Sequence, residues 1–348
     1  MKGVHPGNVP KSARRHGQFL LNDAMRRYPT VLRMAARGGR QVGNQTRQRR
    51  REILVGLLVR LCSLGYYPRT VDDLKSKHIR VLVRDAEQRK VSPSTFNGYS
   101  TCLKRLYRAI GKPQLVDDVN GYLLDRRFAR RSGVAQFDKS LEGAGIAFSE
   151  VRARAMEVDP RVACILELCF EFGMRAREAW EFRPALTLQG GVICIFWGCK
   201  GGRKRQLPFA PTEKHIALVE WAKSFVRTDA ESMIPRGVKL HQWKARWQRA
   251  MKKIGLTREQ LGRTPHALRH SFLCRYFSAV SEHEPPVRGG RLHRIDPHAD
   301  RAARELVGDA AGHGRRSVSS AYIGGATEGA TGSLSTQMSA DDSAEPDS

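Results

Sequence analysis

The stretch His266-Ala267-Leu268-Arg269-His270-Ser271-Phe272 decides how this chain is interpreted. His266 and Arg269 are three positions apart, a spacing that places both side chains on one face of a helix. Taken alone, such a pair is usually part of a solvated helix surface. Its meaning therefore depends on what the rest of the chain supplies.

Three other segments supply side chains of a related kind. The segment GMRARE at 173–178 lies at a predicted helix end, where Gly173 can adopt the left-handed conformation that closes a helix. The segment CKGGRKR at 199–205 is predicted to be the basic tip of a β-hairpin. Gly312-His313 is followed by Tyr322, nine residues after the histidine. Each segment taken alone has an ordinary explanation as surface or packing.

Together these segments contain the groups needed for metal-free transesterification at a phosphodiester. Two guanidiniums can hold the non-bridging oxygens, on which negative charge builds in the transition state. A tyrosine phenol can attack phosphorus when a base removes its proton, and a lysine can protonate the departing 5′-oxygen. The predicted catalytic residues are Arg175, Lys200, His266, Arg269, His313 and Tyr322. No metal site and no cofactor is predicted.

The composition points to a polyanionic partner. The chain has 348 residues with 61 Lys and Arg against 34 Asp and Glu, a formal net charge of +27. Such an excess favours nucleic acid. The absence of a long apolar run and of a secretory h-region predicts a protein without membrane spans in the cytoplasm, associated with the bacterial nucleoid. Seven Cys without a CxxC pair indicate reduced thiols.

Charge and periodicity divide the chain into five parts. We expect a basic arm at 1–45, a helical DNA-binding domain at 46–112, a linker at 113–147, a second domain at 148–325 and an acidic disordered tail at 326–348. The fold class is mainly α, and the second domain is mixed α/β, mostly helical with a small antiparallel sheet. The candidates for DNA contact are Arg47, Arg50, Lys104, Arg105, Arg203, Lys204 and Arg205.

The order of these motifs resembles the tyrosine recombinase (phage integrase) family. The resemblance is carried by GMRAREAW at 173–180, CKGGRKRQLPF at 199–209, HALRHSF at 266–272 and AGHGRRSVSSAYIGG at 311–325. It implies a core-binding domain followed by a catalytic domain, with Glu178 as structural support and Tyr322 as the nucleophile. The sequence of the last motif, at 311–325, most resembles that of integrases of phages or integrative elements.

The resemblance implies a site-specific recombinase that needs neither metal nor ATP and forms a 3′-phosphotyrosyl intermediate. Integration or excision of a mobile element is the expected role. Double-stranded DNA is the expected partner, with a monomer when free, a homo-tetramer on paired sites, and accessory DNA-bending or directionality proteins. Two alternatives stay open, namely a type IB topoisomerase-like DNA relaxation and a non-catalytic DNA-binding accessory factor.

Two features depart from a simple match. The gap of 44 residues between Arg269 and His313 is longer than the family usually has, and we expect residues 281–301 to form a mobile surface insertion. Its histidines, His283, His293 and His298, lack the spacing of a zinc site. Tyr276 is a second possible nucleophile by residue type, but its apolar neighbours favour a packing role.

Overall fold

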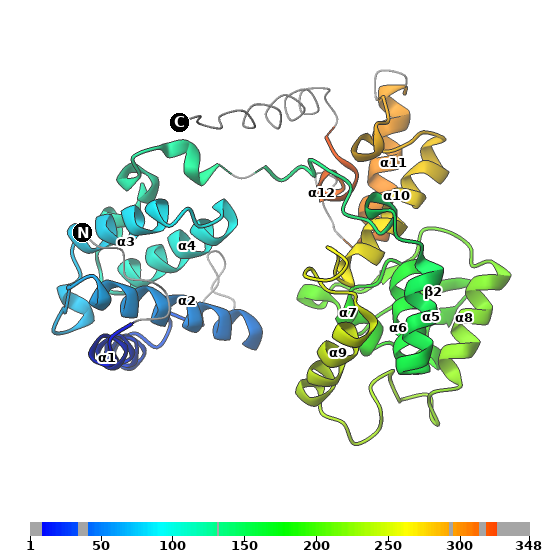
Figure 1. Ribbon diagram of the computed structural model, residues 1–348, viewed down its shortest axis with the longest axis horizontal. Helices are drawn as coiled ribbons and strands as arrows, with labels where there is room; N and C mark the ends of the chain where they lie inside the picture. The colour runs from blue at the N-terminus through cyan, green and yellow to red at the C-terminus, as the bar shows by residue number, and fades with distance from the viewer. Residues whose placement is uncertain (1–8, 34–40, 131, 292–294, 313–317, 326–348) are drawn as a thin grey trace, which may run out of the picture. The chain divides into compact units, whose positions relative to one another are not determined.

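The computed structural model describes residues 9–33, 41–130, 132–291, 295–312 and 318–325 (Figure 1). The chain divides into two compact units between residues 131 and 132. Each unit has its own apolar core. The expected combination of a helical N-terminal domain and a mostly helical second domain with a small antiparallel sheet is confirmed. His313 and the acidic tail at 326–348 lie outside the described residues.

Four helices build the first unit: α1 (Lys11–Arg27), α2 (Asn44–Ser63), α3 (Ser76–Gln88) and α4 (Pro93–Ala109). Ser92 ends the preceding loop and begins α4, because its hydroxyl accepts a hydrogen bond from the Thr95 amide and Pro93 occupies the first helical position. The helices share a core to which all four contribute; it contains Leu20, Leu21, Leu58, Leu61, Ile79, Phe96, Leu103 and Leu106.

Helix α1 corrects the expectation of a simple basic arm at 1–45. Leu20 and Leu21 are fully buried, and Gly17 lets the helix approach α2 so closely that a Cβ atom there would lie 2.6 Å from Val59. The buried positions of α1 follow helical spacing, so its Arg residues lie on the other face of a packed element. High charge density concealed this periodicity in the sequence.

The segment predicted as a linker, 113–147, is divided between the two units. Three short 3₁₀ helices, Pro113–Val116, Val119–Tyr122 and Arg126–Ala129, belong to the first unit. Val116 and Val119 are buried in its core. Residues 132–147 belong to the second unit, where Leu141 is fully buried.

The second unit begins with α5 (Phe148–Val158), α6 (Pro160–Glu171) and α7 (Ala176–Trp180). Strands β1 (Leu188–Gln189), β2 (Val192–Ile195) and β3 (Arg205–Gln206) then form an antiparallel sheet in the order β1-β2-β3. Leu188 pairs with Ile193, and Cys194 pairs with Gln206. A 3₁₀ turn, Lys200–Gly202, connects β2 to β3.

Five further helices complete this unit: α8 (Glu213–Lys223), α9 (Leu240–Ile254), α10 (His266–Ser281), α11 (Pro297–Ala310) and α12 (Ser320–Ile323). Helix α10 is the central element, since it contacts α6, α11 and α12 and buries side chains along most of its length. Trp243 and Trp247 of α9 are buried in the core. Among the described residues, no helix is both long and apolar enough to span a bilayer.

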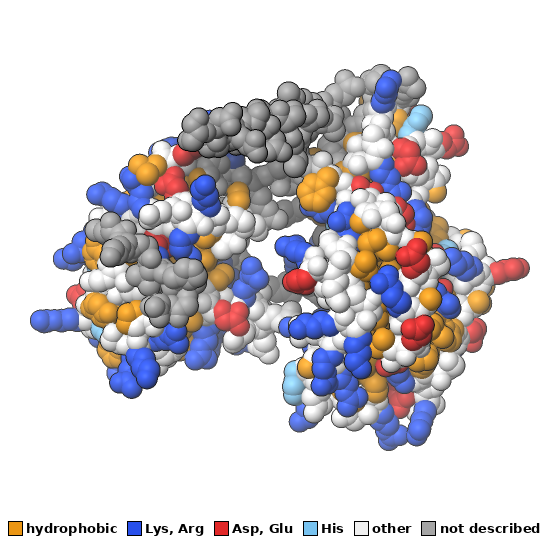
Figure 2. All heavy atoms as spheres, in the orientation of Figure 1, with side chains coloured by type: hydrophobic (Ala, Val, Ile, Leu, Met, Phe, Trp, Pro, Cys, Tyr) orange, Lys and Arg blue, Asp and Glu red, His pale blue; other side chains and the backbone are white. Residues whose placement is uncertain are grey.

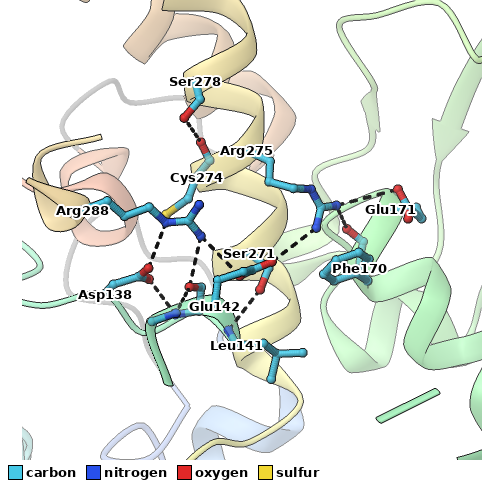
Figure 3. A network of polar contacts seen from close by, with 12 residues as sticks. Asp138, Leu141, Glu142, Phe170, Glu171, Ser271, Cys274, Arg275, Ser278 and Arg288 are labelled. Carbon is cyan, nitrogen blue, oxygen red and sulfur yellow. Dashed lines mark hydrogen bonds and ion pairs between the residues drawn. The ribbon is translucent and has the colours of Figure 1, made fainter. Parts of the chain in front are cut away.

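The described part of residues 281–301 is anchored rather than loosely attached, which corrects the expected mobile insertion. A short 3₁₀ helix, Pro286–Arg288, presents Arg288 to residues 132–147, the entry segment of the second unit (Figure 3). The Arg288 Nε donates to Asp138 Oδ2 at 2.9 Å, and its Nη2 donates to Ser140 at 3.1 Å and Glu142 at 3.2 Å.

The same view shows how this entry segment is attached to α10 (Figure 3). The Leu141 amide donates to the Ser271 hydroxyl at 3.1 Å. Arg275 of α10 stacks on Phe170, with its guanidinium carbon 3.7 Å from the ring centroid, and donates to the Phe170 carbonyl at 2.9 Å. These contacts join two segments distant in sequence, the entry segment and α6, to the helix that carries His266 and Arg269.

We expect Asp138→Asn to lower the free energy of unfolding by about 1–3 kcal/mol, because it removes the charge that faces the half-buried Arg288. Burial would raise the pKa of Asp138, but hydrogen bonds from Ser140 and Arg288 lower it below 3.8. The stabilisation is therefore complete above about pH 4 and disappears as the pH falls below that value. Denaturant titration at pH 7 measures the change, with exposed Asp229→Asn as the control.

Candidate active site

The first candidate arginine is positioned by a glycine turn. After α6 ends, Gly173 has a φ of +57°, and a Cβ atom at this position would lie 2.3 Å from Phe272. The chain then reverses into α7, whose N-cap is Arg175. Glu178 accepts hydrogen bonds from the Arg175 amide at 2.9 Å and from its Nη1 at 2.5 Å. The turn and Glu178 together fix the direction of the Arg175 side chain.

The second arginine, Arg269, is completely buried on α10. Its Nη1 donates to the Gly173 carbonyl, and its Nη2 donates to the Ala311 carbonyl. The Arg175 Nη2 donates to the same Ala311 carbonyl at 3.3 Å. One backbone oxygen at the end of α11 therefore brings the two arginines together.

Tyr322 completes this cluster, which contains Arg175, Glu178, Arg269 and Tyr322. The Arg269 Nε donates to the Tyr322 hydroxyl oxygen at 3.3 Å, and the Arg269 guanidinium carbon lies 5.4 Å from the Tyr322 ring centroid. Tyr322 is only 7% exposed. The two predicted arginines thus share one carbonyl acceptor, and the predicted nucleophile is hydrogen-bonded to Arg269.

Two elements hold the short helix α12 that carries Tyr322. The Ala135 amide of the entry segment donates to the Ser320 carbonyl at 2.8 Å. From α11, the buried Arg304 donates to the Gly324 carbonyl at 3.0 Å and to the Gly325 carbonyl at 3.2 Å. Asp300 fixes Arg304 by accepting from its Nε at 2.8 Å. A helix of four residues needs such external contacts because its own hydrogen bonds cannot hold it.

Two histidine rings lie beside Tyr322. The His266 ring centroid is 6.2 Å from that of Tyr322, and the His270 centroid is 4.9 Å from it. His266 is exposed at the start of α10, yet desolvation and the positive charges of Arg269 and Arg175 lower its pKa to about 4. Burial is the largest cause that lowers the pKa of His270 to about 3, and the nearby side chains of His266, Lys139 and Arg269 contribute to the same shift. Both rings are neutral at pH 7, so each can accept a proton.

Two residues that we expected to contact DNA, Arg205 and Arg50, are buried, which corrects the expectation that they lie at the surface. Arg205 is 8% exposed, and its Nη2 pairs with Glu178 Oε2 at 3.0 Å. Arg50 is 9% exposed and donates to the Leu32 carbonyl at 2.9 Å. Alternation explains Arg205, because β3 turns this side chain inward while its neighbours Lys204 and Gln206 are exposed. Motif spacing gave no sign that Arg205 belongs to the cluster.

The remaining basic candidates lie at the surface or are half-buried. Lys200, Arg203 and Lys204 are exposed on the turn between β2 and β3, and the Lys204 Nζ lies 5.2 Å from the centre of the Phe196 ring. In the first unit, Arg47, Lys104 and Arg105 are half-buried and lie on α2 and α4. Lys and Arg side chains cover much of the visible face of each unit (Figure 2). Their roles remain predictions.

Tyr276, the other tyrosine considered from sequence, has a packing position. Its hydroxyl donates to the Pro208 carbonyl at 3.2 Å, and its ring stacks on Phe272 with an interplanar angle of 2°. Within the described residues, no group of three or more His, Cys, Asp or Glu side chains is arranged to hold a metal ion.

Comparisons with known proteins agree with this fold. A family model described as Integrase matches residues 106–275. A lambda integrase dimer bound to a COC′ core site is 16% identical, with a TM-score of 0.54 over 87% of this chain and 77% of that chain. The Tn1549 transposon integrase in complex with transposon right end DNA is 15% identical, with a TM-score of 0.53 over 90% of this chain and 96% of that chain.

A lambda integrase tetramer bound to a Holliday junction is 15% identical, with a TM-score of 0.52 over 90% of this chain and 80% of that chain. No curated protein matches the chain. The family match and the shared fold agree with the resemblance to the tyrosine recombinase (phage integrase) family that the motif order carries. The structural matches are below one fifth identity, so they establish the fold and leave the residue roles to the geometry.

The Gly173 turn can be tested with a matched pair of substitutions. Gly173→Ala and Gly190→Ala place Ala at nearly the same φ, +57° and +56°, but an added Cβ at Gly173 would meet Phe272 and one at Gly190 would meet no described atom within 4 Å. We expect Gly190→Ala to cost about 1–2 kcal/mol for the backbone alone, and Gly173→Ala to cost about 2 kcal/mol more through the clash with Phe272. Denaturant unfolding measures both; equal losses would show that Phe272 does not constrain the turn.

His270 predicts a pH dependence of stability. An unfolded His takes up a proton near pH 6.5, whereas the folded His270 remains neutral until about pH 3. Stability therefore falls as the pH drops from 6.5, by on the order of 2 kcal/mol at pH 4.5. His270→Gln should flatten this part of the profile measured by thermal or denaturant unfolding. An unchanged slope would show that His270 titrates normally in the folded protein.

Proposed function

We propose that the protein is a site-specific DNA recombinase that cuts and rejoins DNA through Tyr322. The observation that supports this most directly is that Arg175 and Arg269 share the Ala311 carbonyl as acceptor while the Arg269 Nε donates to the Tyr322 hydroxyl. Two fixed guanidiniums next to a phenol hydroxyl suit a phosphodiester whose phosphorus is attacked by that hydroxyl. The order of the motifs along the chain agrees with the same reaction.

The cleavage step is a transesterification. The Tyr322 oxygen forms a bond to phosphorus as the bond from phosphorus to the 5′-oxygen breaks, which leaves a 3′-phosphotyrosyl link and a 5′-hydroxyl. The proton on Tyr322 passes to neutral His266, and Lys200 protonates the departing 5′-oxygen. One phosphoester replaces another, so the reaction requires no nucleotide hydrolysis, and reversal of the same step rejoins the strands.

The arginines stabilise charge in this step. A phosphodiester has one negative charge, and its pentacoordinate transition state has close to two. Arg175 and Arg269 are held by Glu178 and by backbone carbonyls, so they need little reorganisation when the charge develops. His313 is proposed to donate to the same phosphate oxygens, on the basis of the sequence motif alone.

Strand exchange requires several copies of the protein on two DNA sites. Lambda integrase has been solved as a tetramer on a Holliday junction. We propose a corresponding homo-tetramer here, with basic side chains of both units on the DNA backbone. Integration or excision of a mobile element is the proposed role, with accessory DNA-bending or directionality proteins as partners.

Tyr322→Phe should abolish covalent attachment to DNA while leaving DNA affinity within about threefold, because it removes only the attacking oxygen. The assay incubates the protein, without added metal, with nicked suicide duplexes taken from the flanks of its gene and detects adducts by denaturing electrophoresis. Tyr276→Phe is the matched control and should retain the adduct.

Three outcomes would contradict the proposal. Failure of the wild type to form an adduct on every candidate duplex would exclude the covalent mechanism. An adduct that persists in Tyr322→Phe would exclude this nucleophile. Relaxation of supercoiled DNA by the free monomer at arbitrary sequences would favour a topoisomerase activity over site-specific recombination.

A further inference from the structure

Arg205 has an unusual environment for an arginine. Its side chain is 5% exposed, and its Nη2 approaches Glu178 Oε2 at 3.0 Å and the Gly173 carbonyl at 3.5 Å. Its Nε and Nη1 are buried and have no hydrogen-bond partner among the described residues. Gly312 packs directly on this side chain, since a Cβ atom there would lie 2.9 Å from the Arg205 Cδ. A buried arginine is usually fully paired, so these unused donors need an explanation.

The charges around Glu178 do not balance in the free protein. One carboxylate faces three guanidiniums: Arg175 Nη1 lies 2.5 Å from Oε1, and Arg205 Nη2 and Arg269 Nη1 lie 3.0 Å and 3.9 Å from Oε2. This cluster therefore has a net charge of +2. Without Arg205 it would have a net charge of +1, because Glu178 would cancel the charge of either Arg175 or Arg269.

An excess of buried positive charge is unfavourable unless an anion is bound. Desolvation and the nearby Arg269 lower the pKa of Arg205 to about 9, which shows the same strain. The transition state of phosphodiester transesterification has close to two negative charges, which equals the charge that the cluster offers when Arg205 is present. The buried Arg205 guanidinium thus brings the net positive charge of the cluster to the value of the negative charge in the transition state.

We propose that Arg205 is a positioning residue of the strand-transfer reaction: it neutralises Glu178, so that the charges of Arg175 and Arg269 both act on the scissile phosphate. This inference rests on the proposed function. Arg205 acts through Glu178 and does not contact the DNA. Glu178 fixes the direction of Arg175, and Arg205 offsets the electrostatic cost of having that carboxylate beside a phosphate site.

The test compares Arg205→Met with the double variant Arg205→Met/Glu178→Gln. The single variant reduces the cluster to +1, whereas the double variant restores +2 and keeps an amide oxygen for the Arg175 backbone. We expect Arg205→Met to slow single-turnover cleavage of the nicked duplex by about 10- to 100-fold with DNA affinity nearly unchanged. The double variant should recover at least about tenfold of that loss.

A substrate with a neutral scissile group distinguishes an electrostatic effect of Arg205→Met from a structural effect. Replacing a non-bridging oxygen of the scissile phosphate with methyl removes one negative charge, so the difference between wild type and Arg205→Met should shrink by about tenfold or more. Arg161→Met is the matched control: Arg161 is a half-buried arginine of the same unit that donates to the Met233 and Phe225 carbonyls. It should leave cleavage unchanged on both substrates.

The outcomes distinguish this inference from the proposed function. Absence of an adduct with wild type would overturn the proposed function itself. A wild-type adduct with an unaffected Arg205→Met would overturn only the role of Arg205. If Arg205→Met does not fold, the double variant, which has no unbalanced carboxylate, provides the comparison, and cleavage by it as slow as that of Arg175→Ala would overturn the inference. A loss that is equal on the methylated and natural substrates would also do so.

Discussion

A single buried carboxylate organises the second unit. Glu178 is 1% exposed, and its ionised form is maintained because three guanidiniums surround it: burial alone would raise its pKa, whereas Arg205, Arg269 and Arg175 lower it. An isolated buried charge of this kind would be strongly destabilising. The elements that carry these arginines, α7, β3 and α10, must therefore be in their native positions together.

Backbone carbonyls provide the second constraint. The Gly173 oxygen accepts from Arg269 and Arg205, and the Ala311 oxygen accepts from Arg269 and Arg175. Both carbonyls lie at helix ends, where oxygen atoms lack partners within the helix. Guanidiniums satisfy these oxygens, and the helix ends in turn fix the guanidiniums. The arrangement explains how one carboxylate and two backbone carbonyls keep three arginines rigid.

The sequence predicted the general architecture and pointed to three side chains that the structure brings together, because helix ends, turns and motif order are local signals. Helix spacing, caps and the Gly173 turn are short-range features, and the motif order brought Arg175, Arg269 and Tyr322 together in one hypothesis. Arg205 and Arg50 were misjudged, because whether a basic side chain points inward depends on partners distant in sequence. Helix α1 was missed for a related reason. Its apolar positions are buried by packing against α2, and the high positive charge of the segment masked them in the sequence.

The state of Arg269 in the free protein also constrains the reaction. All three of its nitrogens already donate hydrogen bonds, two to backbone carbonyls and one to Tyr322. The carbonyl bonds hold the side chain and use only one hydrogen of each terminal nitrogen. The bond from Nε differs, because its acceptor is the proposed nucleophile itself. In the proposed reaction the scissile phosphate and the Tyr322 hydroxyl both lie next to Arg269, so the phosphate competes with Tyr322 for this donor. In the free protein Arg269 is thus satisfied by the group that, in the proposed reaction, attacks the phosphate, and α12, held by Ala135 and Arg304, carries that group.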